Sequence, residues 1–337
     1  MTPQRFDEIT ARYPLLRLAL AGDFCLDRYF DIDPAKAERS IETGLVVHNI
    51  VRVRCQPGAA GTILNNLVAL GVGEVRVIGC CGQDGEGYEL KRALSLMPGV
   101  CLEGLVEAPE RRTFTYTKPL ILRPGLPPEE LNRLDIKNWN PTPAEVRNQI
   151  ARHVERASKD TDGLILMDQV DLAETGVVTR ELLEEVRQAL LRQPKWLVLG
   201  DSRRGLRSWP PISFKMNAAE LKAMSGELTN TVVECQRAVE RVAASNGRAA
   251  FVTLADRGIV GAAPGGPSVS VPSLPIRGPI DIVGAGDSVT ANLTAALAAG
   301  ATLTEAMELA MVAASLVIHQ LGTTGTASVA QIRSMLF

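Results

Sequence analysis

The chain has 337 residues, of which 46% are hydrophobic and 22% charged, and this composition excludes a largely disordered protein. Its 36 Lys and Arg residues against 38 Asp and Glu residues leave a formal net charge of -2, which lacks the basic excess typical of nucleic-acid-binding proteins. The length fits one large α/β domain or two small ones. With 3 His and no Cys-x-x-Cys pair, zinc-site spacing is absent, and the 6 cysteines are expected to be reduced thiols of a cytoplasmic protein.

Runs of aliphatic and β-branched residues alternate along the chain with segments of helical periodicity. The predicted strands are 17–22, 46–53, 75–81, 163–167, 196–200 and 250–254, and the predicted helices are 61–70, 84–96, 143–158, 179–192, 231–245, 289–299 and 303–319. Such alternation predicts a mostly parallel sheet with helices on both faces. Because ligands of such sheets bind beyond the carboxyl ends of the strands, functional residues are expected in the segments that follow strands.

Two segments depart from this alternation and are predicted to form a small antiparallel flap on the main domain. Residues 31–54 and 111–121 are extended, and within the second one residues 113–117 alternate with period two, as in a strand exposed on one face. Residues 122–143 are rich in Pro and charge and are predicted to be a long surface connection. No apolar run is long enough to span a bilayer, so no membrane partner is expected.

The strongest chemical signal is the segment DIVGAGDS at 281–288, which precedes the predicted helix 289–299. Gly284 and Gly286 let the backbone approach a ligand without a Cβ, and the amides at the helix start, together with the helix dipole, form an anion site. Asp287 beside such a site fits a general base that deprotonates a hydroxyl facing a phosphoryl group. The alternative is a Gly-rich strand–helix turn in which Asp287 is an ordinary charge at a helix start.

With further segments in the same order and spacing, this motif resembles the PfkB/ribokinase family of ATP-dependent carbohydrate kinases. Those segments are LALAGDFCLDRY at 18–29, PGAAGTILNNLVALG at 57–71, residues 79–87, NAAE at 217–220 and TLADRG at 253–258. The resemblance covers nearly the whole chain. It implies a ribokinase-like α/β fold with a mostly parallel central sheet, helices on both faces and a small β flap (lid), in a single domain over 1–337.

The resemblance also implies the roles of the glycine-rich segment. Asp287 would be the catalytic base toward a sugar hydroxyl. The amides of Gly284, Ala285 and Gly286 would form the anion hole for the phosphoryl group that leaves ATP. Asp281 and the nearby backbone would help to hold a monovalent cation such as K⁺.

Further roles follow for the acceptor and the nucleotide. The residues implied to bind the sugar are Asp27, Gly58, Gly61 and Asn66. The residues implied to lie beside ATP and its Mg²⁺ are Asn217, Glu220, Arg203, Thr253, Asp256 and Gly258, with Glu220 acting on the metal side through water. Flaps of this family also pair subunits, so a homodimer is expected.

The residues themselves leave alternatives open. Asp27 also fits a surface carboxylate paired with Arg28, and the glycines at 58 and 61 also fit tight strand–helix packing. The pair Asn217 and Glu220 also fits a helix capping box. The basic residues Arg111, Arg112 and Lys118 on the flap fit either a grip on a sugar phosphate or a solvated face. His319 is expected to be a structural residue at a helix end.

Within the family, the chain most resembles the kinase domain of bifunctional heptose-7-phosphate kinase/ADP-heptose synthase proteins. The segments that carry this are GDFCLDRY at 22–29, RLD at 133–135 and LGT at 321–323. The resemblance implies transfer of the γ-phosphoryl of ATP to a heptose 7-phosphate. No HxGH-type nucleotidylyltransferase motif is present, so a kinase module alone is expected.

Four positions depart from the pattern of those heptose kinases. Thr62 stands where the family usually has Asn, and Met311 stands where Asn is common near the adenine. MDQ at 167–169 replaces Ser-Asp-Tyr, and DSR at 201–203 replaces Asp-Pro-Lys. Two alternatives therefore stay open: a kinase for another sugar or a nucleoside, and a catalytically weak sugar- or nucleotide-binding protein on the same fold.

Overall fold

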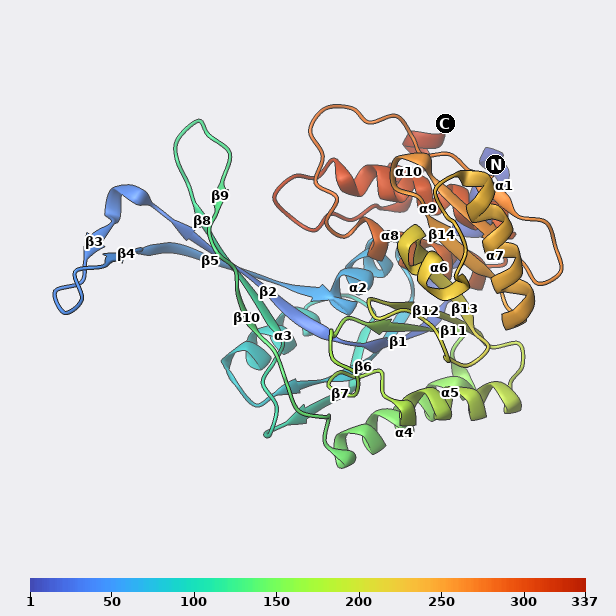
Figure 1. Cartoon of the computed structure of the whole chain (residues 1–337), viewed down its shortest axis with the longest axis horizontal. Coiled ribbons are helices and arrows are strands. Elements are labelled where there is room, and N and C mark those ends of the chain that lie inside the picture. Colours follow the sequence, from blue (N-terminus) through green and yellow to red (C-terminus); the bar gives the residue numbers. More distant parts are fainter.

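The computed structural model describes residues 1–337 and contains two large sheets and a short two-stranded ribbon (Figure 1). The strands of the main sheet are β1 (Arg17–Gly22), β6 (Glu74–Gly82), β7 (Val100–Ala108), β11 (Gly163–Asp168), β12 (Leu197–Ser202), β13 (Ser213–Asn217), β14 (Ala250–Thr253), β15 (Ile259–Ala262) and β16 (Val269–Val271). They lie in the order β16-β15-β14-β13-β12-β11-β1-β6-β7. All neighbours from β7 to β14 pair in parallel, and β15 and β16 are added antiparallel.

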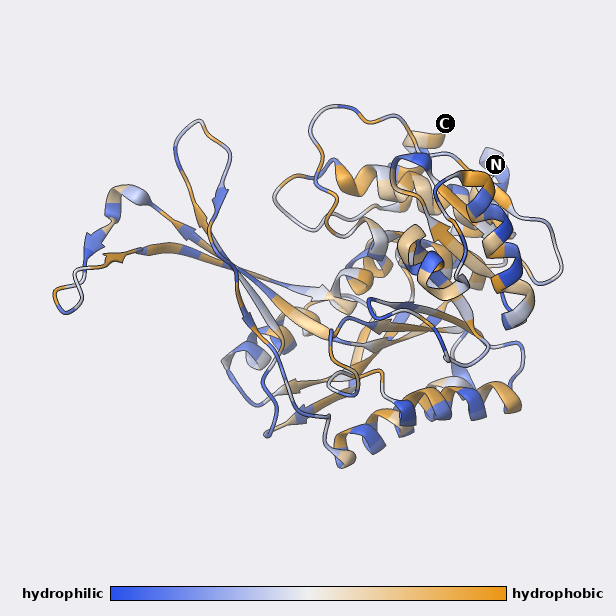
Figure 2. Ribbon diagram, viewed as in Figure 1, coloured by the Kyte–Doolittle hydropathy of each residue, from blue (hydrophilic) through white to orange (hydrophobic).

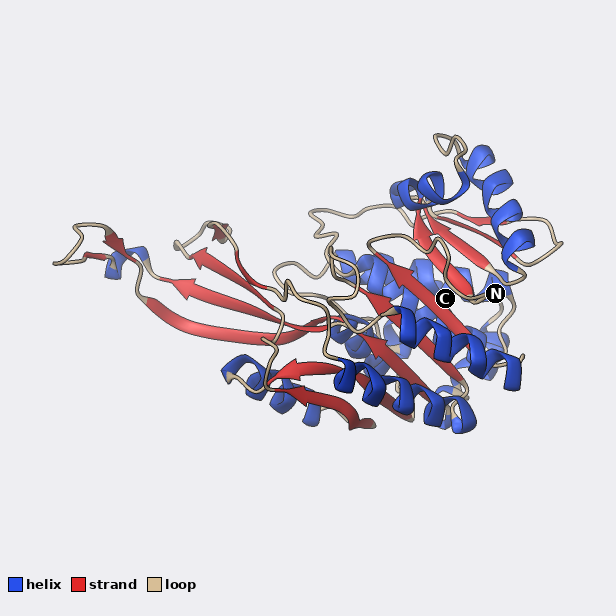
Figure 3. Ribbon diagram, turned by 60° about the horizontal axis from the view of Figure 1, so that its bottom comes forward, coloured by secondary structure: helices blue, strands red, loops and turns tan.

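Helices cover both faces of this sheet (Figure 3). They are α1 (Pro3–Thr10), α2 (Ala60–Ala69), α3 (Gly85–Ser95), α4 (Ala144–Asp160), α5 (Arg180–Arg192), α6 (Ala218–Ser225), α7 (Val232–Asn246), α8 (Ala285–Ala298), α9 (Leu303–Ile318) and α10 (Val329–Leu336), with short 3₁₀ turns at Tyr13–Leu15, Pro34–Lys36 and Ala255–Arg257. No helix combines the length and the apolar character that crossing a membrane requires.

Strand residues alternate between two separate apolar cores, one on each side of the main sheet. Leu18 and Leu20 of β1 belong to the core beneath α2, α8 and α9, whereas Ala19 and Ala21 belong to the core beneath α4, α5 and α7. Every one of these side chains is fully buried. This period of two explains why the central strands read as continuous apolar runs in the sequence.

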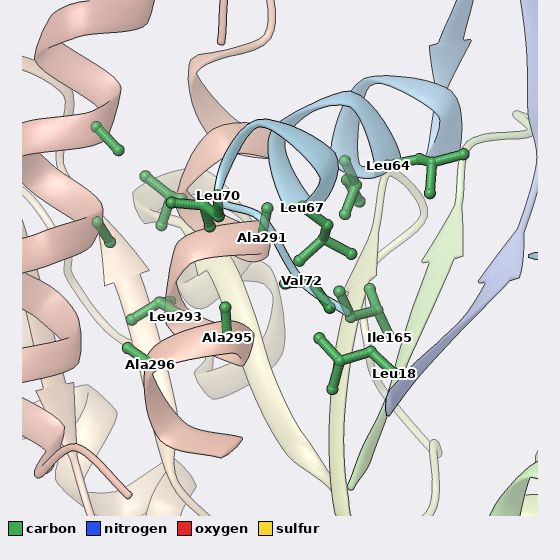
Figure 4. Packing of buried hydrophobic residues seen from close by; sticks show 14 of the residues in the cluster. Leu18, Leu64, Leu67, Leu70, Val72, Ile165, Ala291, Leu293, Ala295 and Ala296 are labelled. Atoms are coloured by element: carbon green, nitrogen blue, oxygen red, sulfur yellow. The ribbon is translucent and has the colours of Figure 1, made fainter. Parts of the chain in front are cut away.

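Helix α8 is held between α2 and α9 by small residues. Ala291 and Ala295 of α8 lie opposite Leu64 and Leu67 of α2, and all four side chains are fully buried (Figure 4). Alanines let the helices approach closely, so the leucines fill the space between them. The start of α8, which carries the glycine-rich segment, is therefore fixed in place by the core.

The second sheet forms a flap that projects from the body of the molecule (Figures 1 and 3). Its strands are β2 (Phe24–Ile32), β5 (Ile50–Ala59), β8 (Thr115–Ile121), β9 (Glu129–Glu130) and β10 (Leu134–Ile136), in the order β10-β8-β2-β5 with β9 beside β8. The ribbon of β3 (Glu38–Arg39) and β4 (Val46–Val47) forms the tip. Since β2 begins two residues after β1 ends, the flap is a direct extension of the main sheet.

Most predicted elements agree with the structure. The flap is a mixed sheet and not the antiparallel one predicted, because β2 and β8 pair in parallel, and the further differences have clear reasons. The strand predicted at 46–53 is split, because its first residues pair in the tip and its last ones pair with β2. Part of the predicted connection 122–143 forms β9 and β10, which are too short and too polar for a periodicity signal. The helix predicted at 289–299 starts at Ala285, so the glycine-rich segment is its first turn. Strands β2, β7, β13 and β15 were not predicted, because charged residues or glycines interrupt their apolar runs.

Candidate active site

The turn that starts α8 leaves several backbone amides without partners. Gly284, the residue before the helix, has φ +83°, and an ideal Cβ there would lie 2.5 Å from Cγ2 of Thr324, so only glycine fits. The amides of Gly284, Gly286 and Asp287 donate to no acceptor in the chain. The amide of Ala285 donates to a carbonyl of the preceding turn at 3.3 Å. Three unpaired amides at a helix start are the arrangement that an anion site requires.

Asp287 lies in the first turn of α8, in an environment that raises the pKa of its carboxyl. Burial raises the pKa of Asp287 to about 7, the negative charge of Asp201 adds to the rise, and the ammonium of Lys215 opposes it. The charge of Asp27 raises the same pKa, so this second carboxylate lies close enough to interact. A group with a pKa near neutral is suited to accept and release a proton at physiological pH. An ordinary helix-start charge would lack this environment.

Lys215 on β13, which the sequence analysis missed, lies directly beside the anion site. Its Nζ is 2.8 Å from Oδ2 of Asp201, and 9% and 10% of the two side chains are exposed. An ideal Cβ at Gly286 would lie 3.1 Å from the same Nζ. Thr290 of α8 donates to the same Asp201 oxygen at 2.9 Å. The pair therefore ties β12 and β13 to the start of α8 and places a buried positive charge where a phosphoryl group would bind.

The charge on this ammonium is stable. Burial lowers the pKa of Lys215, but the charge and hydrogen bond of Asp201 outweigh this effect and the net shift is upward. The signal available in the sequence was a lysine between Phe214 and Met216, in a short apolar run two residues before the NAAE motif. A lysine inside a central strand is rarely buried without a partner.

The acceptor side of the site lies at the base of the flap. Asp27 on β2 is buried, and Nζ of Lys118 on the neighbouring β8 lies 3.7 Å from its Oδ1. An ideal Cβ at Gly58 would lie 2.5 Å from Oδ2 of Asp27, so the glycine leaves room for the carboxylate. Arg28 pairs with two glutamates of α3 at 3.0 and 2.8 Å, not with Asp27. The surface-pair alternative for Asp27 therefore does not apply.

Two of the proposed sugar-binding residues are not placed for that role. Asn66 is fully buried and its Nδ2 donates to the carbonyl of Thr62, so a sugar has no access to it. An ideal Cβ at Gly61 would lie 2.4 Å from Cβ of Pro57, which is the close strand–helix packing that the sequence left as an alternative. Gln56 has the better position, because it pairs with Asp27 in register and its Nε2 donates to Thr324 at 2.8 Å.

A cavity of about 630 Å³ begins at the glycine turn and runs between α9 and the segment 273–282. Its polar end contains Asn217 and Gly286, and its wall includes Thr253, Asp256 and Gly258. Gly258 has φ +95°, and a Cβ there would collide with a backbone carbonyl at 2.1 Å. The strand–turn segment implied to lie beside the nucleotide thus lines this cavity, whose size is that of a small-molecule site.

Asn217 and Glu220 form a complete capping box at the start of α6. Glu220 accepts from the Asn217 amide at 2.7 Å, and Asn217 Oδ1 accepts from the Glu220 amide at 2.9 Å. No group of three or more His, Cys, Asp or Glu side chains is arranged to hold a metal ion. The donors present fit Mg²⁺ only as an ion that would keep waters and phosphate oxygens as its other ligands, and Glu220 would act on it from the cap through water.

Asp281 and His319 hold the segment that borders the cavity. The Asp281 amide donates to the carbonyl of Ile318 at 2.8 Å, and its Oδ1 accepts from the amide of Val283 at 3.0 Å. His319 caps α9 and its Nε2 accepts from the amide of Arg277 at 3.0 Å, which is a structural role. Both contacts tie the loop before α8 to the end of α9.

The basic residues differ in position. Arg203 does not line the nucleotide cavity. Its charge opposes the rise in the pKa of Asp287 and in that of Tyr116 on β8, so it lies near these two residues on the acceptor side. Arg111 is buried, and its guanidinium donates to two backbone carbonyls, so it cannot grip a phosphate. Arg112 lies 3.6 Å from Asp84 and is mostly exposed.

The Lys215–Asp201 pair generates a stability prediction. Lys215→Met leaves Asp201 buried with only the Thr290 hydroxyl, and breaking a buried pair in this way costs about 3–5 kcal/mol. We expect the single variant to lose more free energy of unfolding than the double variant with Asp201→Asn, measured by denaturant unfolding. Lys222→Met, an exposed site on α6, is the control. Equal stability of the Lys215→Met and Lys222→Met variants would contradict the buried pair.

Known proteins with similar sequences are bifunctional. Among curated relatives, the "Bifunctional protein HldE" of Geobacter metallireducens is 31% identical over 325 residues, which covers 94% of this chain and 62% of that protein. The protein of the same name from Gluconobacter oxydans is 26% identical over 308 residues, covering 91% and 62%. The chain thus spans less than two thirds of the length of these relatives.

Solved structures show the same fold at low identity. Ribokinase of Arabidopsis thaliana, complexed with ribose and ATP, has a TM-score of 0.67 and 19% identity, covering 95% of this chain and 98% of that one. Phosphofructokinase-2 from Escherichia coli, in complex with substrates and products, has a TM-score of 0.73 and 19% identity, with coverages of 95% and 98%. The expected ribokinase-like fold is therefore confirmed.

The sequence profile of the pfkB family carbohydrate kinases matches residues 149–330, slightly more than half of the chain. The matched region contains the anion site with Asp287, both residues of the Lys215–Asp201 pair, the capping box and the whole lining of the nucleotide cavity. The chain belongs to the pfkB family of carbohydrate kinases, phosphotransferases with an alcohol group as acceptor.

Proposed function

We propose that this kinase transfers the γ-phosphoryl of ATP, bound as its magnesium complex, to a hydroxyl of a phosphorylated sugar, with heptose 7-phosphate as the leading acceptor. The observation that carries the proposal is Asp287, a carboxyl with a pKa near 7 that lies between unpaired amides and a second carboxylate, Asp27. The ground for this acceptor is the resemblance of the segments 22–29, 133–135 and 321–323 to heptose-7-phosphate kinase domains, and the bifunctional relatives cover nearly the whole chain. We place the reaction in the cytoplasm.

The chemistry follows from the positions of the charged groups. Asp27 accepts hydrogen bonds from hydroxyls of the sugar, and Asp287 takes the proton of the hydroxyl that attacks. The amides of Gly284 and Gly286 and the ammonium of Lys215 face the phosphoryl group and offset the charge that develops on it. Asn217 and Glu220 would hold Mg²⁺ through water, and the ion would supply positive charge that offsets part of the phosphate charge. The flap covers the sugar and excludes water, a competing acceptor.

Cations around Asp27 favour an acceptor that already carries a phosphate. Lys118 lies on β8 beside Asp27, and Arg133 lies over the ring of Tyr116 with its guanidinium 5.0 Å from the ring centre. Arg203 reaches the same side of the site. Burial raises the pKa of Asp27, and the charges of Lys118 and Arg133 both oppose this rise. Arg133 is also held by Asp135 at 2.7 Å. These cations suit an acceptor that carries a phosphate, because Arg binds phosphate oxygens in a bidentate manner.

The proposed acceptor and the proposed base can be tested in one assay. In a screen of purified protein for ADP release, we expect the highest kcat/KM with heptose 7-phosphate, ahead of hexoses, hexose phosphates and nucleosides. Asp287→Asn should lower kcat by about 10²–10⁴-fold, because proton abstraction is lost. Glu184→Gln, on the exposed face of α5, should not change kcat.

Three outcomes of this screen would change the proposal. Turnover of a hexose with none of heptose 7-phosphate would remove the heptose assignment. Equal turnover by the Asp287→Asn variant and the parent would remove the base. Tight sugar binding without turnover in the parent would favour the sugar-binding protein that Thr62, Met167 and Gln169 leave open.

The pKa of Asp287 generates a pH prediction. The upward shift to about 7 means that the carboxyl is protonated, and unable to accept a proton, below that pH. We therefore expect kcat/KM to rise roughly tenfold per pH unit on the acid side and to level off above neutral pH. Initial rates with the best acceptor, measured in buffers of constant ionic strength, provide the test. A flat profile through neutral pH would contradict this role of Asp287.

We also propose that a monovalent cation binds beside Asp281. Oδ2 of this carboxylate makes no hydrogen bond within the chain, while Oδ1 holds the turn before α8. A cation there would stabilise the loop between Asp281 and Gly284. K⁺ is the ion that the family resemblance favours.

A homodimer formed through the flap is the last part of the proposal. The face of the flap that carries Asp27 and Gln56 is polar, whereas residues on the opposite face are apolar: Phe30, Ile32, Ile50, Val53 and Pro119. Figure 2 shows hydrophobic residues along the outer part of β5. Ile50 and Val53 are 45% and 52% exposed. A second copy of the chain that presents the same face would cover them.

Val53→Asp should therefore convert a dimer into a monomer, because it places a charge in the contact between the two apolar faces. The mass in solution, measured by light scattering after size exclusion, is the readout. Leu191→Asp on α5, a leucine that is 71% exposed and lies away from the flap, is the control. A monomeric parent protein, or a dimeric Val53→Asp variant, would contradict the flap interface.

A further inference from the structure

The end of the nucleotide cavity that lies away from Gly286 is walled by aliphatic side chains. One wall is the face of α9 that carries Met311, Ala314 and Ile318, and the segment 273–282 contributes Leu274, Ile276, Ile280 and Ile282. Because the reacting phosphate must lie at the glycine turn, the base of a nucleotide occupies this apolar end. Its flat faces would contact aliphatic groups on both sides.

The polar side chains of the cavity wall are already engaged. The hydroxyl of Thr253 donates to a backbone carbonyl, and so does that of Ser273. The guanidinium of Arg257 donates to the carbonyl of Asn230 at 2.6 Å. Asp256 is exposed, so water competes for its hydrogen bonds. Of the side chains on α9, only the hydroxyl of Ser315 is available to a base.

Two backbone acceptors of α9 at the same end are engaged as well. The carbonyl of Ser315 accepts from Nδ1 of His319 at 2.6 Å, and the carbonyl of Ile318 accepts from the amide of Asp281. The isoleucines opposite are partly open to water, with Ile276 53% and Ile282 72% exposed. The edge of a base at this place would therefore stay hydrated.

These contacts determine how strongly the site can distinguish one purine from another. A site rejects the wrong base strongly only when it contains buried polar groups that this base leaves unpaired, whereas apolar walls discriminate weakly. Resting on the proposed function, we infer that the donor site accepts ATP and GTP with similar affinity, and that Met311 is the residue that sets this tolerance.

Met311 is suited to this role by its place on the helix. It is 7% exposed, lines the cavity, and precedes Ser315 by four residues, so the two side chains lie on the same face of α9. An amide at position 311 would add a donor and an acceptor next to the Ser315 hydroxyl. The amide and the Ser315 hydroxyl could then hydrogen-bond to the polar edge of a base, whereas the thioether of methionine is only a weak acceptor.

Isothermal titration of the full chain with MgADP and with MgGDP tests the inference without an acceptor sugar. In the parent protein we expect the two dissociation constants to agree within about tenfold, as weak apolar discrimination allows. Met311→Asn should change their ratio by at least about tenfold, whereas the apolar control Met311→Leu should not. Met311→Ser is a second polar variant for the case that the asparagine protein does not fold.

The outcomes separate this inference from the proposed function. A parent that binds one of the two diphosphates more than about tenfold tighter would overturn the tolerance while leaving an ATP- or GTP-dependent kinase in place. An unchanged ratio in both polar variants would overturn the role of Met311. A parent that binds neither diphosphate would overturn the tolerance and the proposed function together.

Discussion

The start of α8 is the constraint on which the rest of the site depends. The amides of Gly284, Gly286 and Asp287 have no partners in the chain, so they need a ligand or water. The left-handed turn at Gly284 orients them. The turn is packed against Thr324, and the helix behind it is held between α2 and α9 by alanines that admit the leucines of α2. A rigid core of this kind allows an unpaired helix start to persist without collapsing onto its own side chains.

The flap meets this fixed point from the other side of the site. Asp27 belongs to β2, which continues β1 of the main sheet, whereas Gln56 on β5 reaches the Thr324 that also packs on Gly284. The acceptor side and the anion site therefore share one contact. A movement of the flap would therefore change the surroundings of both.

Much of this architecture was predictable from the sequence, and the exceptions have physical causes. The alternation of apolar strands and amphipathic helices predicted the main sheet, and the turn chemistry of DIVGAGDS predicted the anion site. The burial of Asn66 could not be predicted from the motif, because the adjacent Asn65 is the same residue type and is only half-buried. The position of Arg111 depended on carbonyls contributed by residues about 30 and 60 positions away, which no local pattern encodes.

Local sequence also does not encode the partner of Lys215, because Asp201 lies on a different strand. The position of this lysine bears on the departure from the family pattern at residues 201–203. DSR at 201–203 has lost the lysine of Asp-Pro-Lys, which considered alone argues for a weakened catalyst. In the structure Asp201 holds a lysine from the neighbouring strand β13, 2.8 Å away and beside Gly286. A positive charge therefore lies beside the glycine turn, and it comes from a different strand. The charge of Asp201 raises the pKa of Asp287 and the charge of Lys215 lowers it, so the pair also sets the pKa of the proposed base. These positions favour a working kinase over a binding protein on the same fold.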